Sequence, residues 1–431
     1  MILGASILQL PAIQQAKAMG LDVVAVDMNP EAIGFKEDGI VKEVISTIDI
    51  PAVVAAAKHH HVDGVMTLAS DMPMRSVAAV AKELGLVGIS DDTALKATNK
   101  AVMRQALKDF GVPIPRFFKV SSSAEYKEVA ASFKVPFIVK PADNSGSRGI
   151  YLIDNLEDKE AISKAYEYSR QYSRNGDVVV EEYMRGPEVS VETLTVDGVC
   201  HVIQITDKLT TGAPHFVEMG HSQPTRLPVD IAEKIRDVAV AANKAVGITN
   251  GPSHTEIIVT SEGPKIVELG ARLGGDCITT HLVPLSTGVN MVECCIRIAL
   301  GEKPDIDHKF SKGSAIRYFQ QHAGIIKSIN GVEEASWIEG VRQISFVHNI
   351  GETVTEIDSS GARLGFVIAQ ADTATNAVSI CQSAMEKITI DIHCCPLKNF
   401  IAKTPRKAST AVVCSSRVAS PAPSGPVSAA P

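Results

Sequence analysis

The sequence predicts a protein of the α/β class with a smaller α+β region toward its C-terminal end. Short β-branched runs alternate with helical patterns over residues 1–90, and strands and helices alternate again over residues 191–310. Residues 313–395 combine strands and helices with glycine-rich turns. Alternation of strands with helices is typical of parallel sheets covered by helices. A chain of 431 residues is long enough for about three folding units of ~150 residues each.

The first unit, residues 1–90, is predicted to be a Rossmann-like sheet. A turn at Gly4-Ala5-Ser6 follows the first strand. We expect strands over residues 1–3, 23–26, 65–68 and 87–89, and helices over residues 11–19 and 72–84. The turn lacks the G-x-G-x-x-G fingerprint of dinucleotide-binding proteins. We therefore interpret residues 1–90 as a structural sheet that packs against a neighbouring domain.

The second unit, residues 91–190, carries a candidate phosphate site. A predicted helix over residues 93–110 precedes a strand over residues 137–141, which contains Lys140. The loop that follows reads DNSGSRG, and such small residues let backbone N–H groups surround an anion. A strand-borne lysine adds a point charge for phosphate oxygens. The residues alone fit a strand-end lysine and a flexible turn equally well, because a Walker A motif is absent.

The next strand, over residues 178–184, ends in acidic residues. Glu181, Glu182 and Met184 lie at this end, and Glu188 follows a Gly-Pro turn. Backbone groups at a strand end can read an adenine edge, and a nearby carboxylate can accept ribose hydroxyls. Taken alone, these residues favour a simpler interpretation, an edge strand with solvated acids.

Two further carboxylates lie in neighbouring β-type stretches. Glu256 and Glu268 flank a Ser-Glu-Gly turn, so we expect a hairpin that brings both carboxylates to one face. Facing carboxylates repel each other without a cation. Mg²⁺ bridging to ATP phosphates resolves this repulsion, since Mg²⁺ favours a few carboxylates plus phosphate oxygens. Arg272 follows among glycines, which suggests close approach to an anionic group.

Composition excludes several classes of protein. Hydrophobic residues make up 45% and charged residues 21%, and the formal net charge is −7. These are ordinary globular values, and a mildly acidic chain lacks the basic surface of a general nucleic-acid binder. No apolar run approaches the ~20 residues that span a bilayer. We expect no nucleic-acid or membrane partner and a cytoplasmic location with reduced cysteines.

Taken in order, these segments resemble the ATP-grasp enzymes over residues 1 to about 395. The resemblance rests on TNKAVMR and FGVPIP over residues 98–115, FIVKP with its small-residue loop, EEYMRGPE over residues 181–188, and Glu256 followed by ELGAR over residues 268–272. Their order and spacing are similar to those of D-alanine–D-alanine ligases, biotin carboxylases and related carboxylate–amine ligases. The resemblance implies an ATP-grasp fold with a pre-ATP-grasp N-terminal domain and a small C-terminal α+β lobe.

The resemblance also implies a role for each matching residue. Lys100 and Lys140 would contact ATP phosphates, and Glu256 and Glu268 would bind Mg²⁺, for which Mn²⁺ can substitute. Arg272 would stabilise the acyl-phosphate and the tetrahedral adduct. The loop with Ser145, Gly146 and Ser147 would close over the phosphates; Glu181, Glu182 and Met184 would form the adenine hinge, and Glu188 would hold ribose. Many relatives carry Asn at the position of Gly270, which leaves the number of Mg²⁺ ions open.

A narrower resemblance is to bacterial L-amino-acid ligases, which make dipeptides. The segment HFVEMGHSQP over residues 215–224 is similar to their substrate segment, and GARLGGD over residues 270–276 to the loop after their metal strand. The match implies that Glu218 binds the ammonium group of the first amino acid and that His221 lies beside the reacting carboxyl group. Glu218 and His221 could instead belong to an ordinary polar loop.

The expected function is that of an ATP-dependent carboxylate–amine ligase. It would activate an amino-acid-type carboxylate as an acyl-phosphate and join it to an amine, giving ADP and phosphate. Its partners would be small-molecule substrates, and because relatives are often dimers, a homodimer is open. Two alternatives remain: a biotin- or purine-type carboxylase using bicarbonate, and a nucleotide-binding scaffold without turnover.

The expected domain boundaries follow the same segments. Residues 1–90 form the N-terminal domain, 91–190 the small lobe with the phosphate loop, and 191–395 the large lobe with the metal and substrate site. Residues 396–431 contain six prolines, five basic residues and no acid. Such a composition cannot bury a core, so we expect a disordered tail.

Overall fold

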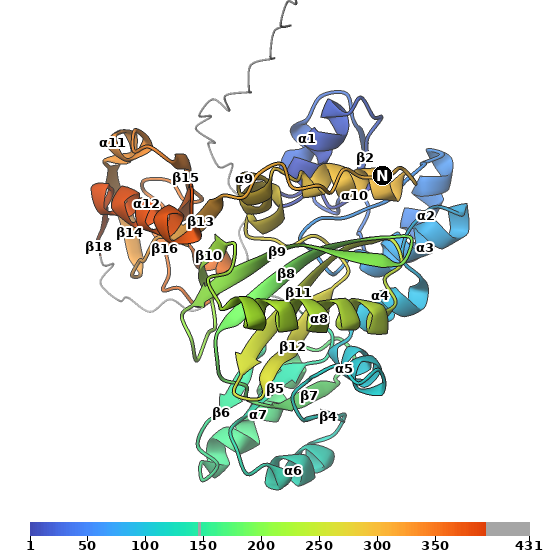
Figure 1. Cartoon of the computed structure of the whole chain (residues 1–431). Helices are drawn as coiled ribbons and strands as arrows, with labels where there is room; N and C mark the ends of the chain where they lie inside the picture. Colours follow the sequence, from blue (N-terminus) through green and yellow to red (C-terminus); the bar gives the residue numbers. More distant parts are fainter. Residues whose placement is uncertain (145–147, 394–431) are drawn as a thin grey trace, which may run out of the picture.

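The computed structural model describes residues 1–144 and 148–393. A large central sheet is surrounded by three smaller parts: the N-terminal region, a small lobe and a C-terminal lobe (Figure 1). The tail expected over residues 396–431 lies outside the described residues.

The N-terminal region contains a parallel sheet in the order β1-β2-β3. Its strands are β1 (Ile2–Leu3), β2 (Val24–Val26) and β3 (Val41–Glu43), and its helices are α1 (Leu10–Ala18), α2 (Ile50–His59) and α3 (Met74–Leu84). Two predicted strands were wrong. Residues 65–68 pair only through isolated bridges, and residues 87–89 form no strand but pack a buried Ile89 against the core.

The helix predicted over residues 93–110 is two helices, which corrects the expectation. They are α4 (Asp91–Thr98) and α5 (Lys100–Asp109). Between them, Asn99 is extended, and its side chain accepts hydrogen bonds from the backbone amides of Ala101 and Val102. Asparagine at this position caps a new helix rather than continuing the old one. The break places Lys100 in the first turn of α5, where its side chain reaches the site.

The small lobe is an antiparallel sheet in the order β4-β7-β5-β6, covered by two helices. Its own core joins aromatic and aliphatic side chains of both layers. The elements are β4 (Phe117–Val120), α6 (Ser123–Ser132), β5 (Phe137–Pro141), β6 (Tyr151–Ile153), α7 (Lys159–Gln171) and β7 (Val178–Glu182).

The central sheet has eight antiparallel strands in the order β12-β11-β8-β9-β10-β13-β17-β15. The expected hairpin around the Ser-Glu-Gly turn is confirmed as β11–β12. The strands are β8 (Glu188–Val196), β9 (Val199–Thr210), β10 (Glu218–Gln223), β11 (Gly251–Thr260), β12 (Gly263–Gly270), β13 (Gly313–Tyr318), β15 (Val341–Phe346) and β17 (Gly365–Ala371). The helix α8 (Val229–Val246) lies along this sheet (Figure 1).

The C-terminal lobe contains a separate three-stranded sheet in the order β16-β14-β18. The helix α12 (Ala374–Lys387) packs on β13 and β17, so the lobe shares a core with the central sheet. The remaining α-helices and strands are α9 (Val283–Thr287), α10 (Met291–Ala299), β14 (Gly324–Asn330), α11 (Val332–Ser336), β16 (Thr353–Val354) and β18 (Thr389–His393).

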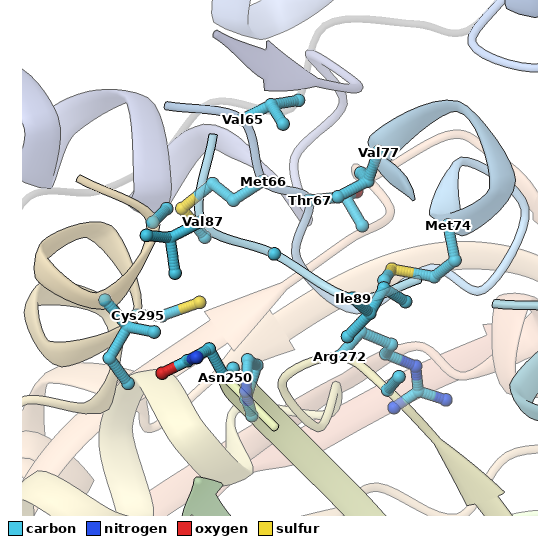
Figure 2. Close-up of a pocket in the computed structure, with 16 residues that line it drawn as sticks. Val65, Met66, Thr67, Met74, Val77, Val87, Ile89, Asn250, Arg272 and Cys295 are labelled. Carbon is cyan, nitrogen blue, oxygen red and sulfur yellow. The ribbon is translucent and has the colours of Figure 1, made fainter. Parts of the chain in front are cut away.

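The N-terminal region does not have a core of its own. One cluster joins side chains of the N-terminal region, α4, α5, α8 and the central sheet, and a second joins the N-terminal region with α10. A cavity of about 40 Å³ remains between them. Val65, Val87, Asn250 and Cys295 line it, with Arg272 at one side (Figure 2). This shared packing sets the position of the N-terminal region relative to Arg272.

No single helix among residues 1–144 and 148–393 has the length and apolar character needed to cross a membrane. One bent pair, Ile278–Thr287 with Met291–Ala299, meets the requirement by length and composition alone, with 113° between its halves.

Candidate active site

Three charged side chains are buried where the small lobe meets the central sheet. Lys140 is the penultimate residue of β5, and its Nζ lies 2.6 Å from a carboxylate oxygen of Glu181 on the neighbouring strand β7. Arg104 on α5 donates to both oxygens of Glu181, at 2.6 and 3.1 Å, and also to the carbonyl of Val267 at 2.6 Å. Arg104 therefore ties the small lobe to β12.

This buried triad carries a net positive charge. Burial would raise the pKa of Glu181, but Arg104 and Lys140 lower that pKa to about 2, so the carboxylate stays ionised. Burial lowers the pKa of Lys140, and Glu181 opposes that effect. The Nη1 atom of Arg104 is buried and has no hydrogen-bond partner among the described residues. A spare buried donor beside a lysine is suited to an anion.

Lys100 connects three elements at the same place. Its Nζ donates to the carbonyl of Asn144 at 2.6 Å and lies 2.7 Å from an oxygen of Glu268 on β12. The predicted phosphate-loop residues come directly after Asn144. Those residues, Ser145, Gly146 and Ser147, lie outside the described part of the chain. The structure therefore brings Lys100 and Glu268 to the start of this loop.

Glu256 and Glu268 lie directly opposite each other on β11 and β12, as the hairpin predicted. Behind Glu256, the buried His254 contacts Glu192 at 2.7 Å and Glu256 at 3.4 Å. Burial would lower the pKa of His254, but Glu192 and Glu256 raise it to about 9, so the imidazole is cationic at neutral pH. Lys100 beside Glu268, and His254 and Lys208 beside Glu256, thus compensate two carboxylates that would otherwise repel each other.

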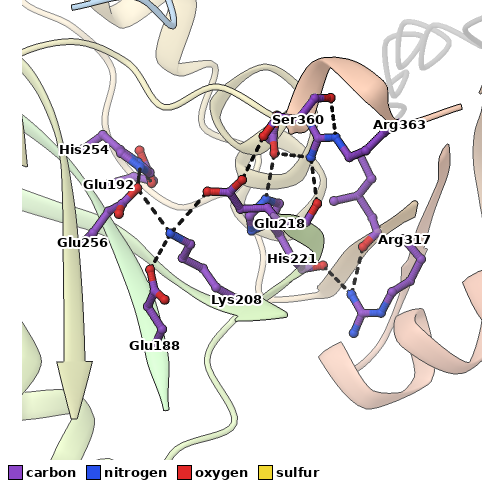
Figure 3. A network of polar contacts seen from close by, with 12 residues as sticks. Glu188, Glu192, Lys208, Glu218, His221, His254, Glu256, Arg317, Ser360 and Arg363 are labelled. Carbon is purple, nitrogen blue, oxygen red and sulfur yellow. Dashed lines mark hydrogen bonds and ion pairs between the residues drawn. The ribbon is translucent and has the colours of Figure 1, made fainter. Parts of the chain in front are cut away.

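Lys208 on β9 links three carboxylates that the sequence did not connect. Its buried Nζ lies 2.6 Å from Glu188, 3.2 Å from Glu256 and 3.8 Å from Glu218 (Figure 3). Burial would lower the pKa of Lys208, but Glu256, Glu188 and Glu218 raise it well above its usual value. One fixed cation therefore holds the proposed ribose, metal and ammonium carboxylates around a common point.

The C-terminal lobe contributes to the pocket around Glu218. Ser360 donates to a carboxylate oxygen of Glu218 at 3.0 Å, and Arg363 donates to the Glu218 carbonyl at 2.9 Å (Figure 3). Arg363 also donates to both oxygens of Asp276, at 2.7 and 2.8 Å. The same carboxylate lies 3.3 Å from Nε2 of the buried His221, whose Nδ1 has no partner among the described residues. This Nδ1 is therefore a buried polar atom without a partner among the described residues.

Arg272 lies just beyond β12 and is bound by the N-terminal region. Its guanidinium donates to both oxygens of Asp71, at 2.9 and 3.1 Å. Burial would lower the pKa of Arg272, but Asp71, Glu256 and Glu268 raise it. Arg272 therefore stays cationic beside the two proposed metal carboxylates.

The structure gathers most of the residues predicted for the site and adds four. Three separate sets of contacts hold these residues: Lys140 with Glu181, Lys100 with Glu268, and Lys208 with Glu188, Glu218 and Glu256. The hairpin places Glu256 opposite Glu268 and so brings the second and third sets together. The Glu181 side chain points to Arg104 and Lys140, so only backbone groups of its strand end are left for a base. Glu182 and Met184 lie at that strand end. The residues that sequence reasoning missed are Asp71, Arg104, Lys208 and Arg363. One signal existed: Lys208 is the only lysine or arginine between residues 186 and 225.

Comparison with known families identifies the architecture. Residues 133–280 match the model of the ATP-grasp domain, and residues 317–393 match the L-amino acid ligase C-terminal domain 2. Residues 133–280 therefore form an ATP-grasp domain, and the chain is similar to ATP-grasp ligases that form C–N bonds. The ATP-grasp match contains Lys140, Glu256, Glu268 and Arg272, so these four residues lie within the ATP-grasp domain.

Individual relatives have low sequence identity to this chain but match it over most of its length. The L-arginine-specific L-amino acid ligase of Bacillus subtilis is 26% identical over 291 residues, 66% of this chain and 70% of that protein. The phosphoribosylamine–glycine ligase of Methanococcoides burtonii is 26% identical over 392 residues, 86% and 88% of the two chains. The crystal structure of an L-amino acid ligase from Bacillus licheniformis has a TM-score of 0.79 at 22% identity. The match covers 91% of this chain and 98% of that one. At this identity the structural likeness shows the fold.

Proposed function

We propose that this ATP-grasp ligase activates the carboxylate of one amino acid as an acyl-phosphate and joins it to the amine of a second substrate. The observation that carries the proposal is the cluster around Lys208, in which Glu188, Glu256 and Glu218 converge. A nucleotide bound at Glu188 and an amino acid bound at Glu218 would meet beside Glu256. The similarity of residues 317–393 to the L-amino acid ligase C-terminal domain supports the same substrate class.

The nucleotide end has the charges that ATP requires. Lys100 and Lys140 would hold phosphate oxygens, with the loop at Ser145, Gly146 and Ser147 closing over them. The Nη1 of Arg104, which has no hydrogen-bond partner among residues 1–144 and 148–393, supports an anion at this place. Backbone groups near Glu181, Glu182 and Met184 would contact adenine, and Glu188 would accept ribose hydroxyls.

Glu256 and Glu268 fit a magnesium ion shared with ATP. They lie opposite each other across one hairpin, and each is paired with a lysine, Glu268 with Lys100 and Glu256 with Lys208, which supports a cation at this place. Among residues 1–144 and 148–393 no group of three or more His, Cys, Asp or Glu side chains is arranged to hold a metal. Phosphate oxygens and water would complete the shell, and Mn²⁺ could replace Mg²⁺. Bound metal would neutralise charge on the transferring phosphoryl group.

The substrate end places charged groups around an amino acid. Glu218 would accept the ammonium group, and His221 would lie beside the reacting carboxyl group, with Asp276 and Arg363 holding its orientation. In the first step a carboxylate oxygen attacks the γ-phosphorus and ADP leaves. In the second step the amine nitrogen attacks the acyl carbon and phosphate leaves, giving an amide. Arg272 would stabilise the oxyanion of the second step.

A carboxylase that uses bicarbonate is the second candidate, because biotin carboxylases share the fold. One such neighbour, from Campylobacter jejuni, has a TM-score of 0.70 at 19% identity. A carboxylase would hydrolyse ATP in the presence of bicarbonate without any amino acid.

A screen of amino-acid pairs with an isotope label decides between these functions. Phosphate release and product mass are measured for each pair, using a first amino acid with ¹⁸O in its carboxyl group. Acyl-phosphate formation transfers one ¹⁸O atom to the released phosphate and leaves the other in the amide. Bicarbonate-dependent turnover with no active pair would establish the carboxylase instead, and no turnover with either would favour a nucleotide-binding scaffold.

The Glu268→Gln variant is expected to lose amine-dependent ADP release by roughly a hundredfold or more, because it removes a charged ligand at the transferring phosphoryl group. Steady-state ADP release checks this. Glu262→Gln changes an exposed residue in the turn of the same hairpin, which pairs with Lys265; it is the control and should retain activity. Full activity of Glu268→Gln would overturn the metal assignment.

The Glu218→Gln variant is expected to raise the KM of the first amino acid about tenfold or more, with a smaller change for ATP, because the neutral amide lacks the negative charge that pairs with an ammonium ion. Initial-rate measurements with each substrate varied in turn separate these effects. An unchanged amino-acid KM would remove Glu218 from the substrate pocket.

A further inference from the structure

The position of Asp71 is set by the docking of the chain segment that precedes it. It lies in the segment before α3, and this segment is docked on the residues that follow β12: the Ala69 amide donates to the Leu273 carbonyl at 3.2 Å, and Leu68 bridges to Leu273. Ala69 is held at a positive φ of 57°, a conformation that costs a non-glycine residue energy. These contacts therefore fix the position of the Asp71 carboxylate beside Arg272.

The Asp71–Arg272 pair has the geometry of a clamp. Two parallel hydrogen bonds, from Nε to Oδ1 and from Nη2 to Oδ2, fix the plane of the guanidinium. Only 14% of the Asp71 side chain and 16% of the Arg272 side chain are exposed, so solvent competes little for these bonds.

Gly270 makes room for this clamp. A Cβ atom built at Gly270 would lie 2.6 Å from Oδ1 of Asp71 and 3.2 Å from Nε of Arg272. Gly270 is absent from the residues with positive φ, so its backbone does not require glycine. Asp71 thus occupies the space that a side chain at position 270 would need, at the position where many ATP-grasp relatives carry Asn.

We propose that Asp71, on the N-terminal region, is a positioning residue for the ligase reaction: it occupies the space that a side chain at position 270 would fill and orients the guanidinium of Arg272 toward the acyl site. The assignment rests on the proposed function only for the role of Arg272. The mutual exclusion of Asp71 and a side chain at 270 follows from the geometry alone.

Kinetics test the positioning role. Asp71→Ala is expected to lower kcat for amide formation by roughly ten- to hundredfold, because a misaligned catalytic group costs about that much. The KM of ATP should stay within about twofold, because Asp71 itself is assigned no contact with the nucleotide. Asp71→Asn keeps the size but only one acceptor oxygen, and it should fall between the wild type and Asp71→Ala. Glu37→Gln, which breaks the Lys17 ion pair in the same region, is the control.

A double-mutant cycle tests whether Asp71 and a side chain at position 270 exclude each other, and its measurement does not depend on catalysis. Gly270→Ala should lower the melting temperature of the wild type and should cost less in the Asp71→Ala background, where the clash is gone. Gly275→Ala is the matched control, because its Cβ would meet only Ala69 at an ordinary 3.5 Å.

The two readouts separate the two hypotheses. Non-additive melting temperatures together with absent ligase turnover would support the clamp and refute the proposed function. Equal costs of Gly270→Ala in both backgrounds, or full kcat in Asp71→Ala, would overturn the positioning role. A higher Mg²⁺ requirement with unchanged kcat in Asp71→Asn would overturn it in favour of a metal ligand.

Discussion

Lys208→Met is expected to lower the free energy of unfolding by about 3 kcal/mol and to abolish ligase activity, since removing one partner of a buried ion pair leaves its charge uncompensated. Here three carboxylates lose their common cation. Glu188, Glu218 and Glu256 each have about a quarter or less of the side chain exposed, so water screens their repulsion poorly.

Denaturant unfolding at pH 7 measures the change in Lys208→Met. Lys119→Met is the matched control: Lys119 pairs with Asp177 at 2.7 Å, but half of its side chain is exposed. An exposed pair contributes about 0–1 kcal/mol, so this control should unfold near the wild type. If the two variants lose the same stability, the central role of Lys208 is wrong.

Glu181→Gln is expected to have the second-largest effect, on stability and on ATP binding together. Glu181 neutralises part of the charge of Arg104 and Lys140, and the amide would leave two buried cations facing each other. A pKa shift from 4.5 to about 2 corresponds to roughly 3 kcal/mol. Displacement of Lys140 should also raise the KM of ATP, which initial rates detect.

The pH dependence of this variant has a definite sign. The folded-state pKa of Glu181 lies below its unfolded value, so its stabilisation is fully present above about pH 4.5 and is lost as the pH falls toward 2. The stability gap between wild type and Glu181→Gln should therefore be constant from pH 7 to 5 and shrink below pH 4.5. Glu160→Gln, from an exposed pair with Lys164, should show no such gap. A gap that widens on acidification would contradict the assignment.

The local sequence was sufficient to predict those contacts in the site that join residues close together along the chain. Glu256 and Glu268 flank one turn, so strand alternation and the hairpin were sufficient to place their carboxylates opposite each other. The continuous helix over residues 93–110 failed for an equally local reason. Asn99 caps α5, and the helical pattern on both sides concealed the interruption.

Other contacts could not be predicted because they join distant segments. Asp71 meets Arg272 across 201 positions, and Ser360 meets Glu218 across 142. No periodicity or turn relates such residues, since they are brought together only when sheets and lobes pack on shared cores.

By itself, the sequence determined the order of the elements, the ATP-grasp resemblance and the residue types that carry charge in the site, because strand alternation, turn chemistry and motif spacing act over short stretches of chain. Tertiary structure alone decided how these charges are paired. It showed that Lys208 holds three carboxylates, that Glu181 faces Arg104 and Lys140, and that Asp71 uses the space left by Gly270. The physical reason is that electrostatic and steric interactions depend on distance in space, which packing sets independently of distance along the chain.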